Sequence, residues 1–584
     1  MKQTKTSTLK KVMQFAQPYK DKIFWVVLAV ITLAIFGALR PYMVKNVVDV
    51  YIETKDLEGL NIYVALMALV LILEVSSQFF FTYIASWLGQ NIIKDIRTHL
   101  FDKMLKFRLS YFDNEPVGKL ITRNVSDIES IASIFSQGLF MIVGDILKML
   151  VVLGIMLWMN WKLTLIVLIA MPVLLYATRV FQKHMKVAFE EVRLQVANLN
   201  TFVQERLTGM KIVQLFNRED IEYDNFKTIN QKHNDAWQKN ILYNSIFFPI
   251  ADIVSSVTLG CVIIYGGFTI VQGDNITTTG DLFGYTMMIS MLFNPLRQIA
   301  DKFNVMQMGI VAADRVFEIL DQDDLIQEQG KLTAPDFKGA IQFNNVEFAY
   351  GNGKKVIHGI NLEIKAGQTV AFVGASGAGK STIANLLSRF YDIQSGTILI
   401  DGMDINDFSL GSLRDQIAVV LQDVFLFSDS ILNNIILDNQ HITKEEVITA
   451  AKEIGINNFI EKLPGGYDYN VKERGVMLSS GQRQLIAFLR AYMNNPSILI
   501  LDEATSSIDT YSEELLQKAV EILSKDRTSI IIAHRLATIV NADLIVVMDQ
   551  GHIVETGTHA QLLAKENGAY KNLYESQYVS SVSN

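Results

Sequence analysis

The residues best suited to chemistry form a glycine-rich loop in the second half of the chain. Residues 374–381 match the pattern G-x-x-x-x-G-K-[ST], after an apolar run expected to be a strand and before a predicted helix. Backbone N–H groups of such a loop converge on phosphates, while its lysine reaches the β- and γ-phosphates and its serine can ligate Mg²⁺. The predicted ATP-binding residues here are Gly374, Ala375, Ser376, Gly377, Ala378, Gly379, Lys380, Ser381 and Thr382.

Two acidic residues follow another apolar run further along the chain. Ile498 to Leu501 is expected to be a buried strand, and it ends in Asp502 and Glu503. A carboxylate at the carboxyl end of a parallel strand, beside a phosphate loop, is placed to hold Mg²⁺. The next carboxylate can polarise an attacking water as a general base. The pattern therefore predicts ATP hydrolysis with Glu503 as the base.

A third motif gives the chain a resemblance. Residues 478–482 read L-S-S-G-Q and resemble the signature of ATP-binding-cassette transporters, usually L-S-G-G-Q, with Ser480 in place of a glycine. The exporter half-transporters of this family place six spans before one nucleotide-binding domain. The resemblance implies that two such domains close head to tail, so that the signature contacts ATP held by a partner chain. Its residues are Leu478, Ser479, Ser480, Gly481 and Gln482, with a helix expected from Gln482.

The same resemblance implies roles for four more residues. Tyr350 is the aromatic that stacks on adenine, and Gln422 is the Q-loop residue that senses Mg²⁺ or the γ-phosphate. Asp509 belongs to the D-loop, and His534 holds the γ-phosphate and orients water. The implied catalytic set is Glu503, His534 and Gln422, and the implied Mg²⁺ set is Ser381, Gln422 and Asp502. In the first half, residues 111–118 and 209–216 resemble two cytoplasmic coupling regions.

The elements that position these residues are short strands alternating with helices, which indicates an α/β P-loop domain with a largely parallel sheet. Strands are expected at 341–348, 368–373, 396–400, 417–421, 498–501, 529–533 and 544–548.

The first half of the chain has a different composition. Of 584 residues, 50% are hydrophobic and 19% charged, which is too apolar for an ordinary soluble chain. The net charge of −8 gives no global attraction to nucleic acid, so no nucleic-acid partner is expected. Apolar runs near the ~20 residues that a membrane helix requires predict six spans. They are Ile23–Met43, Ile62–Ile84, Ile134–Trp158, Leu163–Phe181, Ile241–Val271 and Leu282–Leu296.

Basic residues indicate the orientation of these spans. Lys and Arg cluster before the first span and after the second, whereas the connections at 47–60, 160–162 and 272–281 are short and poor in both. Cytoplasmic flanks carry such clusters, so both termini are expected in the cytoplasm. The long cytoplasmic connections are rich in helix formers, and residues 183–214 contain no proline, which predicts helices that continue well beyond the membrane.

Polar residues inside the spans are candidates for contacts with the transported compound, because charges at membrane depth are costly. Asp145 and Lys148 are three residues apart and are expected to neutralise one another. Glu74 is open to either a substrate contact or an interhelical bond. The candidate cavity residues are Glu74, Gln78, Asp252, Met287 and Met291.

These features predict a six-helix transmembrane domain (1–325), a linker (326–339) and a nucleotide-binding ATPase domain (340–584). The expected function is ATP-driven export of an apolar or amphipathic compound, drug-like or lipid, across a cell (plasma or inner) membrane. An ATP-gated channel and a peptide exporter remain alternatives on the same scaffold. The six spans argue against a soluble P-loop ATPase. The expected partner is a second half-transporter chain, with a homodimer favoured over a heterodimer.

Overall fold

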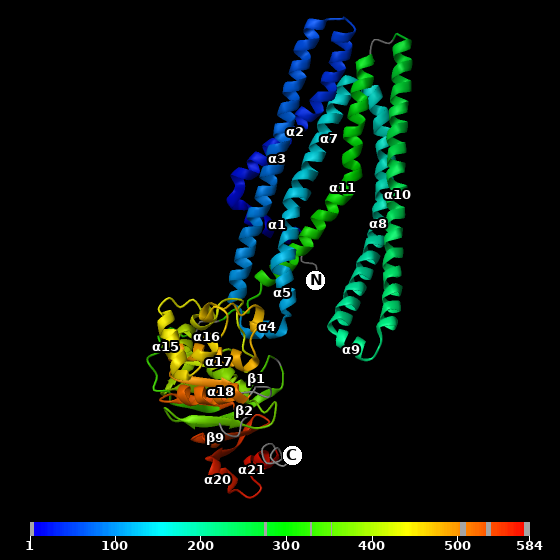
Figure 1. The fold of residues 1–584 in the computed structure, drawn as a ribbon. Coiled ribbons are helices and arrows are strands. Elements are labelled where there is room, and N and C mark those ends of the chain that lie inside the picture. The colour runs from blue at the N-terminus through cyan, green and yellow to red at the C-terminus, as the bar shows by residue number, and fades with distance from the viewer. Residues whose placement is uncertain are drawn as a thin grey trace. The chain divides into compact units, whose positions relative to one another are not determined.

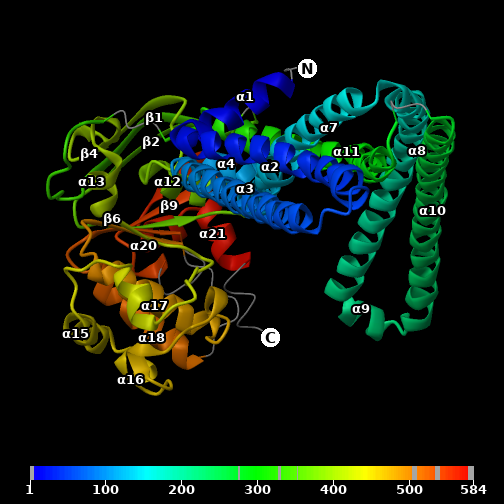
Figure 2. The same ribbon diagram turned by 90° about the horizontal axis from the view of Figure 1, so that it is seen from above.

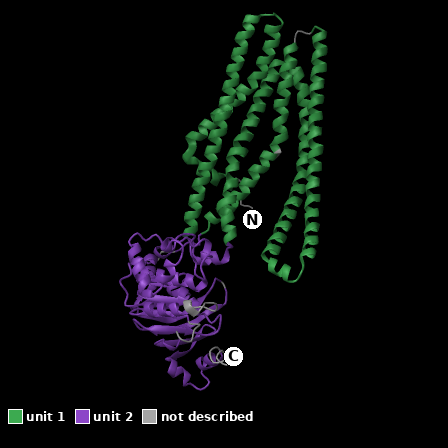
Figure 3. Ribbon diagram, viewed as in Figure 1, with its two compact units in different colours: residues 1–105, 117–322 green, residues 106–116, 323–584 purple. Residues whose placement is uncertain are grey.

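The computed structural model divides into two compact units (Figure 3). The first comprises residues 1–105 and 117–322, and the second comprises residues 106–116 and 323–584. The structure describes residues 5–273, 277–326, 330–351, 353–502, 510–532 and 539–576.

The described residues of the first unit form helices joined by short turns (Figure 1). Asn160 caps one long helix by accepting hydrogen bonds from two backbone N–H groups, and Thr278 caps another in a capping box with Asp281. The helices are α1 (Lys5–Ala16), α2 (Lys20–Asn46), α3 (Leu57–Leu105), α5 (Val117–Thr122), α6 (Ile128–Ser133), α7 (Phe140–Met159), α8 (Trp161–Thr208), α9 (Met210–Leu215), α10 (Glu219–Val271) and α11 (Thr279–Leu320).

The three longest of these helices are far longer than a membrane crossing needs. α3, α8 and α10 contain 49, 48 and 53 residues. At ~1.5 Å per residue each measures about 70 to 80 Å, against a hydrocarbon core of about 30 Å. α8 and α10 lie side by side, with α9 at the turn between them (Figure 2). The predicted helical extensions are therefore confirmed.

Among the described residues, five helical segments are long and apolar enough to cross a membrane, and each contains one of the first five predicted spans. They are Thr8–Ile52, Leu57–Leu105, Val117–Met159, Trp161–Thr208 and Glu219–Val271. α11, which contains the sixth predicted span, is not among them. Its apolar stretch at 282–296 is shorter than the ~20 residues of a full crossing, so that span stays a prediction.

The second unit contains two sheets. In the six-stranded sheet, ordered β10-β9-β3-β8-β7-β6, every pairing is parallel except that of β10 with β9. The four-stranded sheet, ordered β2-β1-β4-β5, is antiparallel. The strands are β1 (Ile341–Ala349), β2 (Lys355–Ile364), β3 (Thr369–Val373), β4 (Ser395–Ile400), β5 (Met403–Asp404), β6 (Ile417–Val420), β7 (Ile498–Asp502), β8 (Thr528–Ile532), β9 (Leu544–Asp549) and β10 (His552–Gly557).

All seven predicted strands are present, but the sequence prediction missed β2, β5, β10 and the antiparallel sheet. The helices of this unit are α4 (Leu109–Asn114), α12 (Lys380–Leu387), α13 (Leu410–Asp415), α14 (Ile431–Ile436), α15 (Lys444–Ile454), α16 (Asn457–Glu461), α17 (Ser480–Met493), α18 (Thr510–Ser524), α20 (His559–Leu563) and α21 (Ala569–Tyr574).

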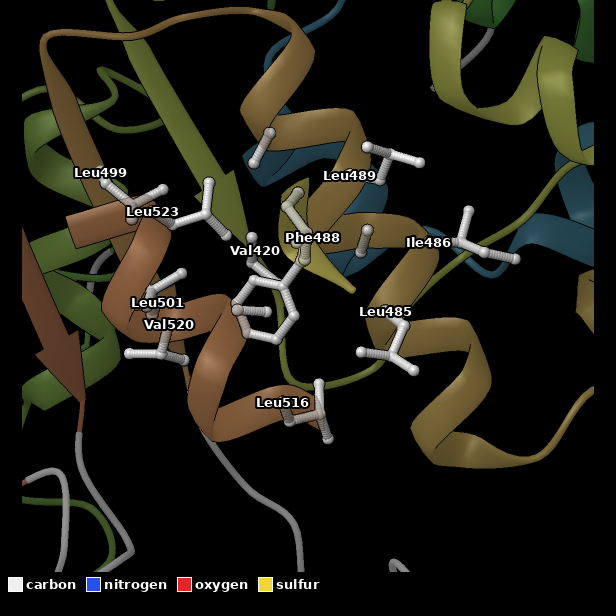
Figure 4. Close-up of a cluster of buried hydrophobic side chains, with 14 of the residues drawn as sticks. Val420, Leu485, Ile486, Phe488, Leu489, Leu499, Leu501, Leu516, Val520 and Leu523 are labelled. Atoms are coloured by element: carbon white, nitrogen blue, oxygen red, sulfur yellow. The ribbon is translucent and has the colours of Figure 1, made fainter. Parts of the chain in front are cut away.

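A hydrophobic core joins α17 and α18 to the parallel sheet (Figure 4). Phe488 of α17 is buried together with Leu501 of β7 and Val520 of α18. Burial of side chains of this size contributes about 1.5 to 3 kcal/mol each. The core therefore fixes the helix that carries the signature against the strand that carries Asp502.

One short segment from between the membrane helices folds with the second unit. Residues 106–116 contain α4, and Phe107 forms a β-bridge with Leu325. The Arg108 Nε–H donates a hydrogen bond to the Leu325 carbonyl at 3.0 Å. The sequence prediction assigned all of residues 1–325 to the membrane domain. The predicted domain borders remain predictions.

Candidate functional site

The phosphate-binding loop connects β3 to α12, as the motif requires. Lys380 begins α12, and its Nζ donates hydrogen bonds to the carbonyl oxygens of Gly374 at 2.8 Å and Ala375 at 2.9 Å. The lysine is buried, and this desolvation lowers the pKa of Lys380, which the nearby Asp502 carboxylate partly counteracts. The side chain is therefore folded over the loop with its ammonium directed at the loop's own carbonyls.

Two glycines allow the phosphate-binding loop to pack closely against β9 and β2. A Cβ on Gly374 would lie 2.1 Å from the Met548 carbonyl oxygen of β9. Gly379 has φ of +98°, and a Cβ there would lie 2.9 Å from Ile357 of β2. A side chain at either position would displace the loop, so the motif's glycines are explained by close packing and backbone conformation.

The sheet brings two predicted metal ligands together. The Ser381 Oγ donates a hydrogen bond to Asp502 Oδ2 at 3.0 Å, although the two residues are 121 positions apart. A hydroxyl and a carboxylate are hard oxygen ligands of the kind that Mg²⁺ takes. Gln422 is exposed and follows β6, which pairs with β7 in parallel with Val420 opposite Leu501. Gln422 and Asp502 therefore follow neighbouring strands at the same edge of the sheet.

Tyr350, the predicted adenine platform, follows β1. Its hydroxyl lies 3.1 Å from Thr382 Oγ1. Its ring meets Tyr391 edge-on, with the centroids 5.0 Å apart. With 37% of its surface exposed, the ring remains accessible beside α12.

The signature forms the start of α17. Ser479 Oγ accepts a hydrogen bond from Gln482 N at 3.2 Å, and Gln482 Oε1 accepts one from Ser479 N at 3.0 Å. This capping box makes Ser479 the N-cap, so α17 begins at Ser480 and the predicted start at Gln482 was wrong by two residues. Leu478 and Gly481 are buried, whereas Ser479 and Ser480 are exposed.

Three predicted site residues lie outside the described residues: Glu503, Asp509 and His534. β7 ends at Asp502, immediately before Glu503, and β8 ends at Ile532, two residues before His534.

Sequence reasoning missed a turn that holds the phosphate loop. Gln550 and Gly551 both have positive φ and connect β9 to β10, which is typical of a tight hairpin. Gly551 N donates a hydrogen bond to the Ala378 carbonyl of the loop at 3.2 Å. The only signal available in the sequence was the glycine between two short runs with strand character.

The polar residues of the spans have partners of their own. Arg40 Nη1 lies 3.5 Å from Glu74 Oε2, and Arg297 pairs with Asp252. Gln78 donates a weak hydrogen bond to Thr82 at 3.4 Å.

The predicted pairing of Asp145 with Lys148 was wrong. Asp145 pairs with Lys302, which α11 brings to it from 157 residues away. Of the two cavity methionines, Met287 is half-buried and Met291 packs against a buried cluster of the first unit.

Comparison with known proteins agrees with this geometry. A family model for the ABC transporter transmembrane region matches residues 23–296, and a model for the ABC transporter matches residues 357–506. A protein of Staphylococcus aureus named as a multidrug export ATP-binding/permease protein is 38% identical over 578 residues, which cover 97% of this chain and 100% of that protein.

Two further relatives span almost the same length. A Bacillus subtilis protein, also named as a multidrug export ATP-binding/permease protein, is 37% identical over 97% of this chain and 99% of its own. The ATP-dependent lipid A-core flippase of Syntrophus aciditrophicus is 35% identical over 97% of this chain and 94% of its own. The chain therefore belongs to the ABC transporter family, as an ATP-hydrolysing half-transporter of the exporter type.

Proposed function

We propose that the chain exports an apolar or amphipathic compound, drug-like or lipid, by alternating access powered by ATP. The observation that carries this proposal is the ATP site, with Lys380 seated over the phosphate loop and Ser381 bonded to Asp502, in one chain with a helical membrane domain. The names of the multidrug and lipid A-core relatives support the chemical class.

At the ATP site, Lys380 exchanges its two loop carbonyls for phosphate oxygens. Burial lowers the pKa of Lys380, and the negative charge of a bound phosphate favours the protonated form of this side chain. Ser381, Asp502 and Gln422 would hold Mg²⁺, which neutralises charge on the phosphates. Glu503 takes a proton from the attacking water, and His534 holds the γ-phosphate and orients the water. The role of Glu503 rests on its place in the sequence after an apolar strand, and the role of His534 rests on the family resemblance.

In the family arrangement, the signature of one chain contacts ATP that is bound to the phosphate loop of a second chain, not ATP bound to its own. We therefore propose that a second half-transporter chain places its Ser479 and Gly481 against ATP bound on residues 374–381 of this one. The exposed Ser479 and Ser480 at the start of α17 support this role. A homodimer is favoured because the phosphate loop, signature, Glu503 and His534 are all present in one sequence.

The test is to express the chain alone, reconstitute it in vesicles and compare it with Glu503→Gln. ATP binding should survive in the variant, while steady-state hydrolysis should fall about a thousandfold or more, as expected for loss of a general base together with its positioning of water. Hydrolysis near the parent rate would contradict the role of Glu503. Hydrolysis that appears only after a second chain is added would contradict the homodimer.

A further inference from the structure

Three helices of the first unit bring charged side chains to one point inside the predicted membrane spans. Arg40 of α2 contacts Glu74 of α3, with 3.5 Å between Nη1 and Oε2. A Cβ placed on Gly37 of α2 would lie 3.3 Å from Glu74 Oε1 and 3.7 Å from Lys148 Nζ of α7. Glu74 and Lys148 therefore both approach Gly37, and Arg40, three residues further along α2, contacts the same Glu74.

The charges of this cluster do not balance. Asp145, one turn from Lys148 on α7, is already paired with Lys302. Within the described parts of the chain, no carboxylate forms an ion pair with Lys148. Arg40 Nε and Glu74 Oε2 are buried and have no hydrogen-bond partner among the described atoms. An excess positive charge at membrane depth is costly, so the cluster favours an anion.

An apolar groove begins at the same arginine. The groove has a volume of about 360 Å³, within the range of small-molecule sites. One side of the groove is formed at helical spacing by Arg40 and Val44 of α2 and by Val47, which directly follows α2. On the other side, Leu71 of α3 lies three residues before Glu74. The charged cluster therefore lies at one end of the apolar groove. The lining residues are Arg40, Val44, Val47, Val64, Met67, Ala68 and Leu71.

α2 and α3 form the two walls of this groove and lie side by side in Figures 1 and 2. Val64 and Leu71 are exposed along it, with 50% and 43% of their surfaces accessible. The groove is therefore open along its side within the first unit, and a chain of methylene groups can enter it without displacing a helix.

We propose that the charged cluster and the groove together bind a single-chain amphipath with one anionic head, of the fatty-acid type. Its carboxylate lies between Arg40 and Lys148, and its tail lies along the valines and Leu71. The inference rests on the proposed export function and narrows its substrate class. Glu74 alone would favour a cationic compound. Because Arg40 neutralises that carboxylate, the cluster favours an anionic one.

The experiment uses the full-length chain in phosphatidylcholine nanodiscs and dodecanoate that carries a diazirine near the end of its tail. Photolabelling should fall on peptides within residues 44–71. Unlabelled dodecanoate should compete for it, whereas dodecyltrimethylammonium, which has the same tail and the opposite charge, should not. Equal competition by the cation, or labelling spread along all the helices, would overturn the proposal without any mutant.

Variants assign the charge selectivity to residues. Arg40→Gln and Lys148→Gln should each reduce labelling about tenfold, which is the loss expected for one charge-assisted hydrogen bond. Lys55→Gln is the matched control, because Lys55 is exposed in the connection between α2 and α3 and lies outside the groove. Unchanged labelling in both variants would overturn the site. An altered mass of the assembled protein in Lys148→Gln would also overturn it, because Lys148 would then pair with an anionic group of a partner chain and not with the amphipath.

The same preparations separate this inference from the function on which it rests. ATP hydrolysis and export of a neutral dye are measured beside the labelling. Intact export without charge-selective labelling would contradict only the anion site. Absence of ATP-driven export of every compound would contradict the proposed function itself.

Discussion

Two backbone contacts hold the phosphate loop from the side of β9 and β10. The Met548 carbonyl oxygen occupies the space where a Cβ on Gly374 would be, and Gly551 N bonds to Ala378 O. A Cβ on Gly551 would lie 2.2 Å from the Val356 carbonyl, and this residue has φ of +81°. The turn can keep its contact with the loop only as long as residue 551 has no side chain.

Gly551→Ala should therefore weaken ATP binding. The new methyl group must displace backbone at a strained φ, which costs of order 1–3 kcal/mol and moves the donor away from Ala378. We expect the dissociation constant of a nucleotide analogue to rise about tenfold in a fluorescence titration. Gly411→Ala is the control, because a Cβ at that position meets nothing within 4 Å. Equal affinities in the two variants would contradict the supporting role of the turn.

Ser479 of the signature caps a helix, and we propose that it also contacts ATP. Ser479 caps α17 in a capping box, and Thr443 caps α15 in the same way. Ser479→Ala and Thr443→Ala should each cost about 1 kcal/mol of stability, as measured by the melting temperature of the full chain. Only Ser479→Ala should lower ATP hydrolysis strongly, by about tenfold or more, because in the proposed dimer only that hydroxyl contacts ATP bound to the partner. A similar loss of hydrolysis in both variants would assign Ser479 to capping alone.

The contiguous motif was predictable from the sequence, whereas the ion pairs between separate helices were not. The phosphate loop was found because its glycines, Lys380 and Ser381 are contiguous in the sequence. The partner of Asp145 was not found, because the local expectation favoured Lys148 on the same helix, whereas tertiary packing supplied Lys302 from α11. Arg40 and Glu74 lie on different helices, and nothing in their spacing indicates the contact between them.

At the scale of elements, side chains at both ends of α4 bind it to the rest of the second unit. Arg108, just before it, forms an ion pair with Asp392 at 3.2 Å, and Asp113, inside it, accepts a hydrogen bond from the Tyr391 hydroxyl. Burial, followed by the contact with Asp113, raises the pKa of Tyr391 above its ordinary value. Tyr391 also contacts the ring of Tyr350, so one side chain touches both α4 and the predicted adenine platform.

Tyr391→Phe should uncouple hydrolysis from the membrane helices. The substitution removes one hydroxyl while keeping the ring beside Tyr350. We expect basal ATP hydrolysis within about twofold of the parent and a loss of most of its stimulation by transported compounds, since one charge-assisted hydrogen bond is worth about 1.5–3 kcal/mol. Tyr492→Phe removes a similar bond, to Glu453, at a position remote in sequence from α4 and serves as the control. Full stimulation in Tyr391→Phe would contradict the coupling role.

The elements that sequence reasoning missed share a physical character. Central strands such as β3 and β7 are almost wholly buried and consist mainly of consecutive apolar residues. β10 alternates between exposed and half-buried residues, and β2 contains polar and charged positions, so neither stands out from a loop by hydrophobicity. The part of α8 that extends beyond the predicted span was predictable as a helix because residues 183–214 are rich in helix formers and contain no proline.

At the scale of the whole molecule, the chain contains a membrane unit and an ATPase unit but only one phosphate loop and one signature. Because the family arrangement pairs these across two chains, the purified protein should hydrolyse ATP cooperatively. We expect a Hill coefficient above 1 for ATP in steady-state kinetics. Mixing the parent with excess Lys380→Ala chains should suppress the activity of the parent, because mixed dimers contain a damaged site. A strictly hyperbolic rate that is insensitive to the variant would contradict pairing.

Transport against a gradient tests the central claim most directly. The chain expressed alone is reconstituted in vesicles whose outward-facing nucleotide-binding domains are supplied with ATP, and accumulation of a fluorescent amphipath is followed with Glu503→Gln vesicles as the control. We predict that parent vesicles concentrate the compound above its external concentration and that the variant vesicles do not. Flux that only runs down the gradient once ATP is added would contradict an exporter and favour an ATP-gated channel.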